Sequence, residues 1–136
     1  MRDHRNLRAF QLADELALLV YRETVGFPKE ELFGLTAQIR RAAVSVASNI
    51  AEGCGRSSAA DFLRFLDMAN GSLRELQYKI SLAHRLGYLA QETSLVSEDS
   101  IVFECGRVLH GLIRSIRSSV VQEEAVSYDC AISSKV

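Results

Sequence analysis

The chain has 136 residues, of which 48% are hydrophobic and 24% are charged, and this balance excludes an intrinsically disordered protein. Its formal net charge of −1 gives no overall argument for a nucleic-acid-binding protein. The length fits one domain with a hydrophobic core, and a single proline leaves room for long uninterrupted helices.

Apolar residues recur at helical spacing in four segments, of which the first two precede Gly55. The first helix is expected from about Asn6 to Thr24, and Pro28 can open the next one at its first turn. The second is expected from about Lys29 to Cys54, with a bend near Gly34. Its apolar positions follow a spacing like that of heptad positions a and d: Leu35, Ile39, Ala42, Val46, Asn49 and Gly53.

The third helix is expected from Ser58 to about Leu86. Ser58 and Asp61 form a start that resembles a capping box. Gly87 is a typical residue to follow the last turn of a helix. These two end signals bound a stripe of apolar residues that is long enough for an extended helix.

The fourth segment is expected to become helical between Glu92 and Ser97, and its apolar pattern ends after Ser119. Residues 1–120 are then interpreted as one domain, and residues 121–136 as a frayed or disordered tail. Four helices with short connections predict an all-α fold, an antiparallel up-down four-helix bundle.

The second segment is unusual because it has two apolar faces. A second line of residues lies beside the heptad-like one: Ala43, Ala47, Ile50 and Cys54. A helix of this kind is buried against more than one neighbour. One interpretation places it in the contact between copies of the chain and predicts a homo-oligomer. The other makes it the central helix of a monomer.

The sequence lacks the patterns of known catalytic and metal-binding sites. Its three histidines form neither Glu-x-x-His nor His-Glu-x-x-His, and its three cysteines are widely spaced. The segment GCGRSS lacks the Gly-Lys-Ser/Thr of a phosphate loop, although helix amides beside Arg56 can hold one phosphate. We therefore expect no enzyme, no catalytic residue, no metal and no cofactor. A small enzyme that uses Cys54 or a carboxylate is the least favoured alternative.

The location of the protein is predicted from what the chain lacks. The first ten residues, MRDHRNLRAF, do not resemble the apolar part of a signal peptide. No apolar run approaches the length of about 18 residues that a membrane helix needs. We expect a cytoplasmic protein with no membrane partner.

Basic residues are concentrated in the middle of the chain. Residues 34–90 carry a charge of +3, whereas residues 1–33 carry −1 and residues 91–136 carry −3. A basic surface can bind phosphates, and copies in a ring would multiply it. Acidic residues within helical reach can also neutralise much of it, so an ordinary solvated surface is the alternative. The candidate nucleic-acid contacts are Arg40, Arg41, Arg56, Arg64 and Arg74.

The segment SNIAEG places two polar residues at a helix end against local preference. Glu52 has the wrong sign for a helix C-terminus, which carries partial negative charge. Asn49 falls on the heptad-like line, where one amide can determine register and assembly state. We predict that Glu52 pairs with Arg56 or with an arginine of a neighbouring chain, and that Asn49 and Glu52 set register or oligomer formation.

The motif FGLTAQIRRAAVSVASNIAEGCGR is long enough to carry a resemblance to a known family. The chain resembles the four-helix bundle family that includes the 23S rRNA-intervening-sequence proteins, well over about residues 7–90 and loosely over the fourth helix. Ala47 stands where a common family pattern has proline. Most members have no established function.

The resemblance also implies more about assembly and partners. The family is similar to the accessory protein of diversity-generating retroelements, which implies a homopentamer that binds nucleic acid and a reverse transcriptase. That relative is highly basic, whereas this chain has a net charge of −1. We expect a non-enzymatic oligomer, with the pentamer favoured, that serves as a scaffold or adaptor for RNA, DNA or a nucleic-acid-handling partner protein. A purely protein-binding assembly is the alternative.

Overall fold

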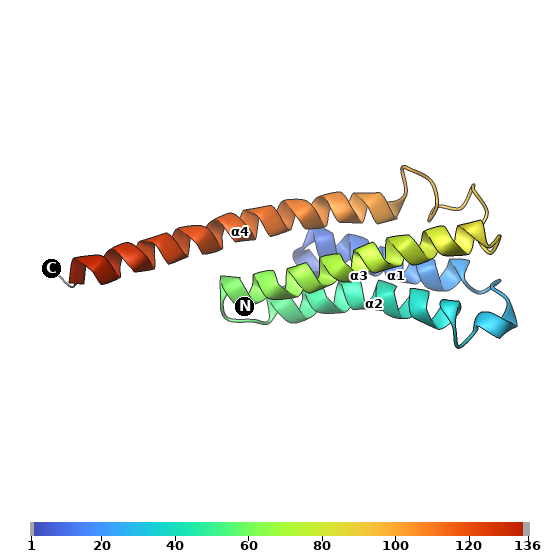
Figure 1. Ribbon diagram of the computed structural model, residues 1–136, viewed down its shortest axis with the longest axis horizontal. Coiled ribbons are helices and arrows are strands. Elements are labelled where there is room, and N and C mark those ends of the chain that lie inside the picture. The colour runs from blue at the N-terminus through green and yellow to red at the C-terminus, as the bar shows by residue number, and fades with distance from the viewer. Residues whose placement is uncertain (1, 135–136) are drawn as a thin grey trace.

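The computed structural model describes residues 2–134, and within them it is all-α. The chain forms four long helices: α1 (Arg8–Glu23), α2 (Leu35–Cys54), α3 (Ala59–Arg85) and α4 (Ile101–Ser134). It also forms two short 3-10 helices, η1 (His4–Asn6) before α1 and η2 (Lys29–Glu31) between α1 and α2. Consecutive helices run in opposite directions (Figure 1). Both α1 and α3 contact α2 and α4, so the four helices form the sides of a bundle. The predicted all-α fold of four helices is confirmed.

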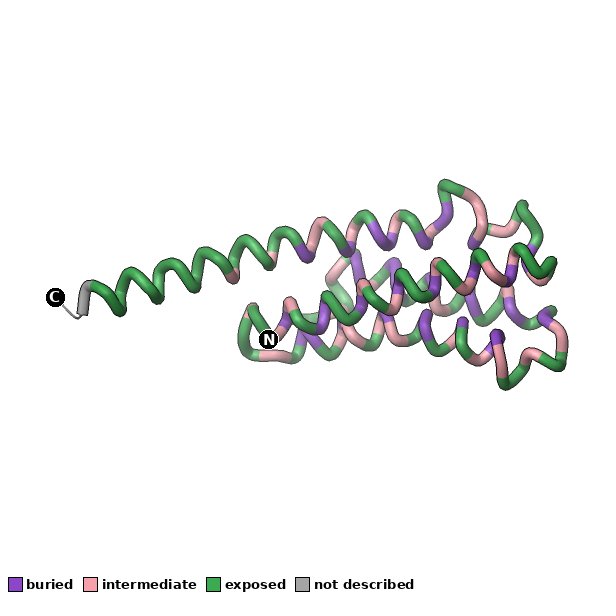
Figure 2. The backbone as a smooth tube through the Cα atoms, viewed as in Figure 1, coloured by how far each residue is buried: buried purple, intermediate pink, exposed green. Residues whose placement is uncertain are grey.

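The core is made by the apolar stripe of each helix. Figure 2 shows buried positions recurring along the inner side of the bundle and ending part-way along α4. Burying a large aliphatic or aromatic side chain contributes about 1.5–3 kcal/mol, so this repeated pattern holds the helices together. The largest fully buried side chains include Leu12, Leu16, Ile39, Val46, Ile50, Phe62, Leu66, Leu73, Leu76 and Leu109.

Both predicted apolar faces of α2 are covered within one chain. Ile39 and Val46 of one face are fully buried, and so are Ala43 and Ile50 of the other. The helices that contact α2 are α1 and α3. Packing against α1 and α3 accounts for the two faces of α2. The two faces therefore do not support an oligomer by themselves, and the oligomer stays a prediction.

Local chemistry at the ends of α3 agrees with the sequence. The Ser58 side chain accepts a hydrogen bond from the Asp61 N–H at the first turn. At the other end, Gly87 has a φ of 83°, and the N–H of Tyr88 donates to the carbonyl of Ala83. This 6→1 bond with a left-handed glycine is the Schellman arrangement that ends a helix. Both predicted ends of α3 are confirmed to within a residue.

The helix predicted from Lys29 begins instead at Leu35, after η2 and a break at Gly34. The start of α4 is also later than expected, at Ile101 rather than between Glu92 and Ser97. The reason is that the preceding connection forms successive turns, and its Leu95 side chain is buried in the core. The apolar residues of this connection anchor a loop and do not form the first turn of a helix.

The end of α4 differs from the expected frayed or disordered tail. The helix continues to Ser134, and its end projects past the α2–α3 turn (Figure 1). No glycine or proline follows Gly111, so nothing in the local sequence stops the helix. Every side chain described from Val121 to Ile132 is exposed. Packing thus ends before the helix does. Residues 135 and 136 of the predicted tail lie outside the described residues.

Candidate docking groove

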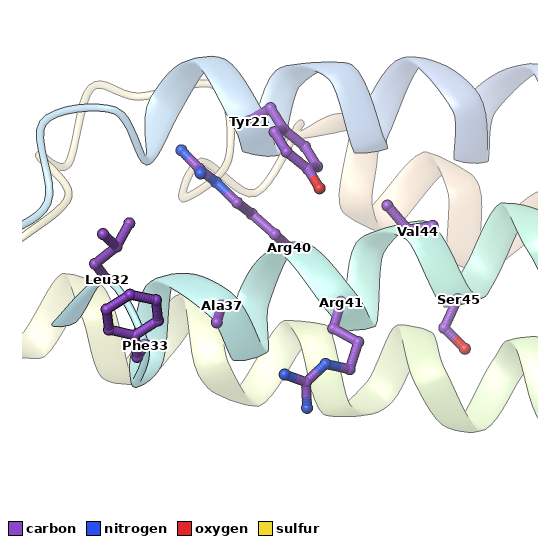
Figure 3. Close-up of a pocket in the computed structure, with 8 residues that line it drawn as sticks. All are labelled: Tyr21, Leu32, Phe33, Ala37, Arg40, Arg41, Val44 and Ser45. Carbon is purple, nitrogen blue, oxygen red and sulfur yellow. The ribbon is translucent and has the colours of Figure 1, made fainter.

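An open groove of about 680 Å³ lies on the outer face of α1 and α2. We call it the docking groove, and Figure 3 shows the side chains that line it. They come from the end of α1, from the linker before α2 and from the first half of α2. The lining residues are Tyr21, Leu32, Phe33, Ala37, Arg40, Arg41, Val44 and Ser45.

The groove exposes large apolar side chains that a four-helix bundle normally covers. Phe33 is 93% exposed, and Leu32, Tyr21 and Val44 are about half exposed. The cause is the break between η2 and α2, because the chain turns at Gly34 and leaves Phe33 outside the core while Phe27 is buried. A contiguous exposed apolar patch on a helical bundle is typical of an interaction site.

Arg40 is held in a defined position at one edge of the groove. Its Nε donates to the Thr24 hydroxyl oxygen at 2.9 Å, and its guanidinium carbon lies 4.7 Å from the centre of the Tyr21 ring. Arg41 extends on the α3 side of α2 in Figure 3, opposite to Arg40. Across residues 2–134 neither guanidinium forms an ion pair, so both positive charges remain available to a ligand.

Arg56 and Arg64 belong to a separate cluster at the α2–α3 turn. Arg56 pairs with Glu52 one helical turn away, and its Nε lies 3.7 Å from an Asp61 oxygen. Arg64 Nε lies 3.0 Å from the same carboxylate. Both guanidinium groups stack on Phe65, with carbons 4.6 and 4.5 Å from its ring centre. The predicted pairing of Glu52 with Arg56 is confirmed, and it occurs inside one chain.

The five predicted arginines therefore do not form one surface. Arg41 and Arg56 are 15 residues apart, which corresponds to about 22 Å along a helix. Arg74 is exposed on α3 and forms no ion pair with the described part of the chain. Within the described residues, Arg40, Arg41 and Arg74 form no ion pair with a carboxylate, whereas Arg56 and Arg64 do.

Asn49 connects α2 to α3 through a short hydrogen-bonded chain. Its amide nitrogen donates to the carbonyl oxygen of Ser45 at 2.9 Å and lies 3.1 Å from the Ser45 hydroxyl oxygen. That hydroxyl is 2.8 Å from the hydroxyl of Ser72 on α3. Asn49 is half-buried, and its contacts favour a role in the register of α2 against α3. A role in assembly state stays a prediction.

Other reactive groups do not gather into a site. Burial raises the pKa of the Cys54 thiol above its ordinary value and that of the Cys105 thiol to about 11, whereas Cys130 is exposed. Among residues 2–134, no cluster of three or more histidine, cysteine or acidic side chains could hold a metal ion. None of the helices described is both long and apolar enough to cross a membrane.

The pattern in the sequence did not reveal the groove. Tyr21, Leu32, Phe33 and Val44 look like core residues, because apolar residues at helical spacing usually are. The available signal was Gly34, which directly follows the pair Leu32–Phe33 and interrupts the helix that the pattern predicts from Lys29. Only packing decides which of these residues stays uncovered.

A family model described as 23S rRNA-intervening sequence protein matches residues 5–111. The chain belongs to this family. The match covers α1, α2, α3 and the first third of α4, so the projecting end of α4 lies outside it. No curated protein matches the chain. The relation to the accessory protein of diversity-generating retroelements stays a resemblance.

Proposed function

We propose that this member of the family is a non-enzymatic scaffold that assembles with copies of itself through the docking groove. The observation that carries the proposal is the exposed apolar lining of the groove beside two arginines that form no ion pair with the described residues. Interface centres are enriched in aromatic residues and arginine, which are the residue types found here. The homopentamer is the favoured assembly because of the resemblance described above.

The test is the mass of the purified chain, measured by sedimentation equilibrium over a range of concentrations. Assembly predicts a multiple of 15.1 kDa, and five copies are expected. Phe33→Asp should reduce the mass to that of a monomer, because a charge in a desolvated contact is strongly unfavourable. Tyr78→Asp is the matched control, since Tyr78 is exposed on α3 and outside the groove. A wild-type mass of 15.1 kDa at every concentration would overturn the proposal, and so would an oligomer unchanged by Phe33→Asp.

Nucleic-acid binding is a second candidate function. Arg41 and Arg74 support it, because both are exposed and neither forms an ion pair with the described residues. The wild-type chain should then shift the mobility of mixed RNA or DNA at low salt. Arg74→Ala should reduce the slope of log affinity against log salt concentration by about one. Absence of any shift at low salt would remove this candidate and leave the protein-binding assembly.

A further inference from the structure

We propose that the docking groove of one copy receives the end of α4 from a second copy. The occupant is the projecting segment, which we define as residues 121–132. This inference rests on the proposed self-assembly and names the part of the partner that fills the groove. Three features support it: an apolar stripe on the projecting segment, complementary charge, and the position of the two elements at opposite ends of the bundle.

The projecting segment has a continuous apolar stripe that nothing in its own chain covers. Val121, Ala125, Tyr128 and Ile132 follow a 4-3-4 spacing, which places them on one side of a helix. Val121 is 58% exposed, Tyr128 68% and Ile132 45%. A helix that projects into water gains nothing from such a stripe, and its apolar side chains are stabilised when a second surface covers them.

This stripe does not continue the face that α4 turns to its own core. The core face contains Leu109 and Ile113, which are buried in the bundle. Since each residue turns an α-helix by about 100°, the stripe from Val121 to Ile132 is rotated by about 120° from that face. In the projecting segment, the residues that lie in line with the core face are Glu124 and Ser127. The apolar stripe therefore serves a different contact from the one that holds α4 in the bundle.

The charges of the two elements are complementary. Residues 118–132 contain three acidic residues and no basic one. At 100° per residue, Glu124 and Asp129 lie on the two sides of the stripe. Among the residues that the structure describes, the charged side chains that line the groove are Arg40 and Arg41. An acidic helix facing two arginines gains favourable pairing, and this pairing also selects orientation.

The two elements also match in the arrangement of their side chains and in length. Ala37 and Val44 lie between Arg40 and Arg41 on the surface of α2, so the groove has an apolar centre and basic edges. The projecting segment has the same arrangement with acidic edges. The stripe extends over about three turns, or about 16 Å, and the groove extends over a similar length from Ser45 to Phe33. A helix laid in a groove is a common mode of recognition.

The position of the two elements shows why the occupant comes from another copy. The groove lies toward the α1–α2 linker, whereas α4 leaves the bundle past the α2–α3 turn at the opposite end (Figure 1). A straight helix cannot reach back to the groove of its own chain. Contacts between different surfaces of successive copies close into a ring when the rotation permits, and otherwise form an open filament.

The first experiment compares two substitutions on the projecting segment of the full chain. Tyr128→Asp places a charge on the stripe and should reduce the mass to 15.1 kDa. Val126→Asp is the matched control, because Val126 is also exposed but lies well outside the stripe. It should leave the oligomer intact. An oligomer unaffected by Tyr128→Asp would overturn the inference. If Phe33→Asp still dissociated that oligomer, the proposed function would stand with a different occupant of the groove.

The second experiment reverses the charges on both sides. The chains carrying Arg40→Glu with Arg41→Glu, or Glu124→Arg with Asp129→Arg, should each be monomeric at concentrations where the wild type assembles. A chain with all four substitutions should assemble again, because each charge meets its opposite. Failure of the four-fold variant to assemble while keeping its helical circular dichroism would overturn the inference. If the groove variants lose their helical circular dichroism signal, they are unfolded. The comparison of Tyr128→Asp with Val126→Asp then decides whether the inference holds.

Discussion

Replacing Gly53 with alanine should destabilise the fold, although alanine is the better helix former. Gly53 lies in the last turn of α2, against Phe62 and Phe65 of α3. A Cβ atom there would lie 2.9 Å from the Cβ of Phe65 and 3.0 Å from the Cδ1 of Phe62. Phe62 is 1% exposed and Phe65 8%, so neither ring has free space to enter. The added methyl group forces the two helices apart.

The magnitude follows from two opposing effects. Glycine to alanine in a helix interior is worth about 1 kcal/mol in favour of folding, and less near a helix end such as this one. Overpacking a well-filled core costs about 1–3 kcal/mol. The net change expected for Gly53→Ala is therefore a loss of about 1–2 kcal/mol in the free energy of unfolding. For a chain of this size, such a loss lowers the melting temperature by about 4–8 °C.

Gly71→Ala is the matched control, because Gly71 lies in the middle of α3 and a Cβ there meets no atom within 4 Å. It should stabilise the chain by about 0.5–1 kcal/mol. Urea unfolding at one fixed protein concentration measures both variants, since assembly makes apparent stability depend on concentration. Equal stability of the two variants would refute the argument from close helix approach.

Three further predictions concern the ends and the interior of the bundle. Gly87→Ala should cost about 1–2 kcal/mol in a thermal melt, because the φ of 83° at Gly87 is unfavourable for any residue with a side chain. Ser72→Ala should cost about 1 kcal/mol in urea unfolding, because it removes the hydroxyl contact between α3 and α2. A thiol reagent at pH 8 should modify Cys130 quickly, and Cys54 and Cys105 only after unfolding, because the last two are buried with raised pKa values.

The pH dependence of stability tests the same thiol environment. Burial raises the pKa of Cys105 to about 11 in the folded chain, against 9.0 for an ordinary thiol. The unfolded chain releases this proton first, so the folded chain holds more protons between these values and stability falls as pH rises through them. The contribution lost is about 2–3 kcal/mol. Cys105→Ala should show a shallower decline between pH 9 and 11, and an equal decline would contradict the prediction.

Two of these predictions have a control substitution of the same residue type elsewhere in the chain. Gly111→Ala should not share the loss of Gly87→Ala, because a Cβ at Gly111 meets no atom within 4 Å and its φ is negative. Ser119→Ala removes a hydroxyl that contacts only its own helix and should change stability little. A stability of Gly87→Ala equal to that of wild type would contradict the argument from the φ of Gly87. A loss of stability in Ser72→Ala no larger than in Ser119→Ala would contradict the argument from the contact between helices. Equal reaction rates of the three thiols would contradict the argument from burial.

Local chemistry in the sequence determined the helices and the contacts within one turn of a helix. The period of the apolar residues predicts four helices because one face of each must be buried. Ser58 and Gly87 were readable as ends because capping depends on a few neighbouring residues. The Glu52–Arg56 pair was predictable for the same reason, since residues four apart share a helix surface.

Only the tertiary structure decided which surfaces remain uncovered. Phe27 and Phe33 look alike in the sequence, yet one is buried and the other is almost fully exposed, because the chain turns at Gly34 and leaves Phe33 outside the core. The two faces of α2 are consistent with an oligomer or with a central helix, and packing against α1 and α3 accounts for both. The five predicted arginines separate for the same reason: two line the groove, two are paired with carboxylates, and one lies apart on α3. A pattern reports that a residue is apolar or charged, but burial depends on which distant segment lies over it.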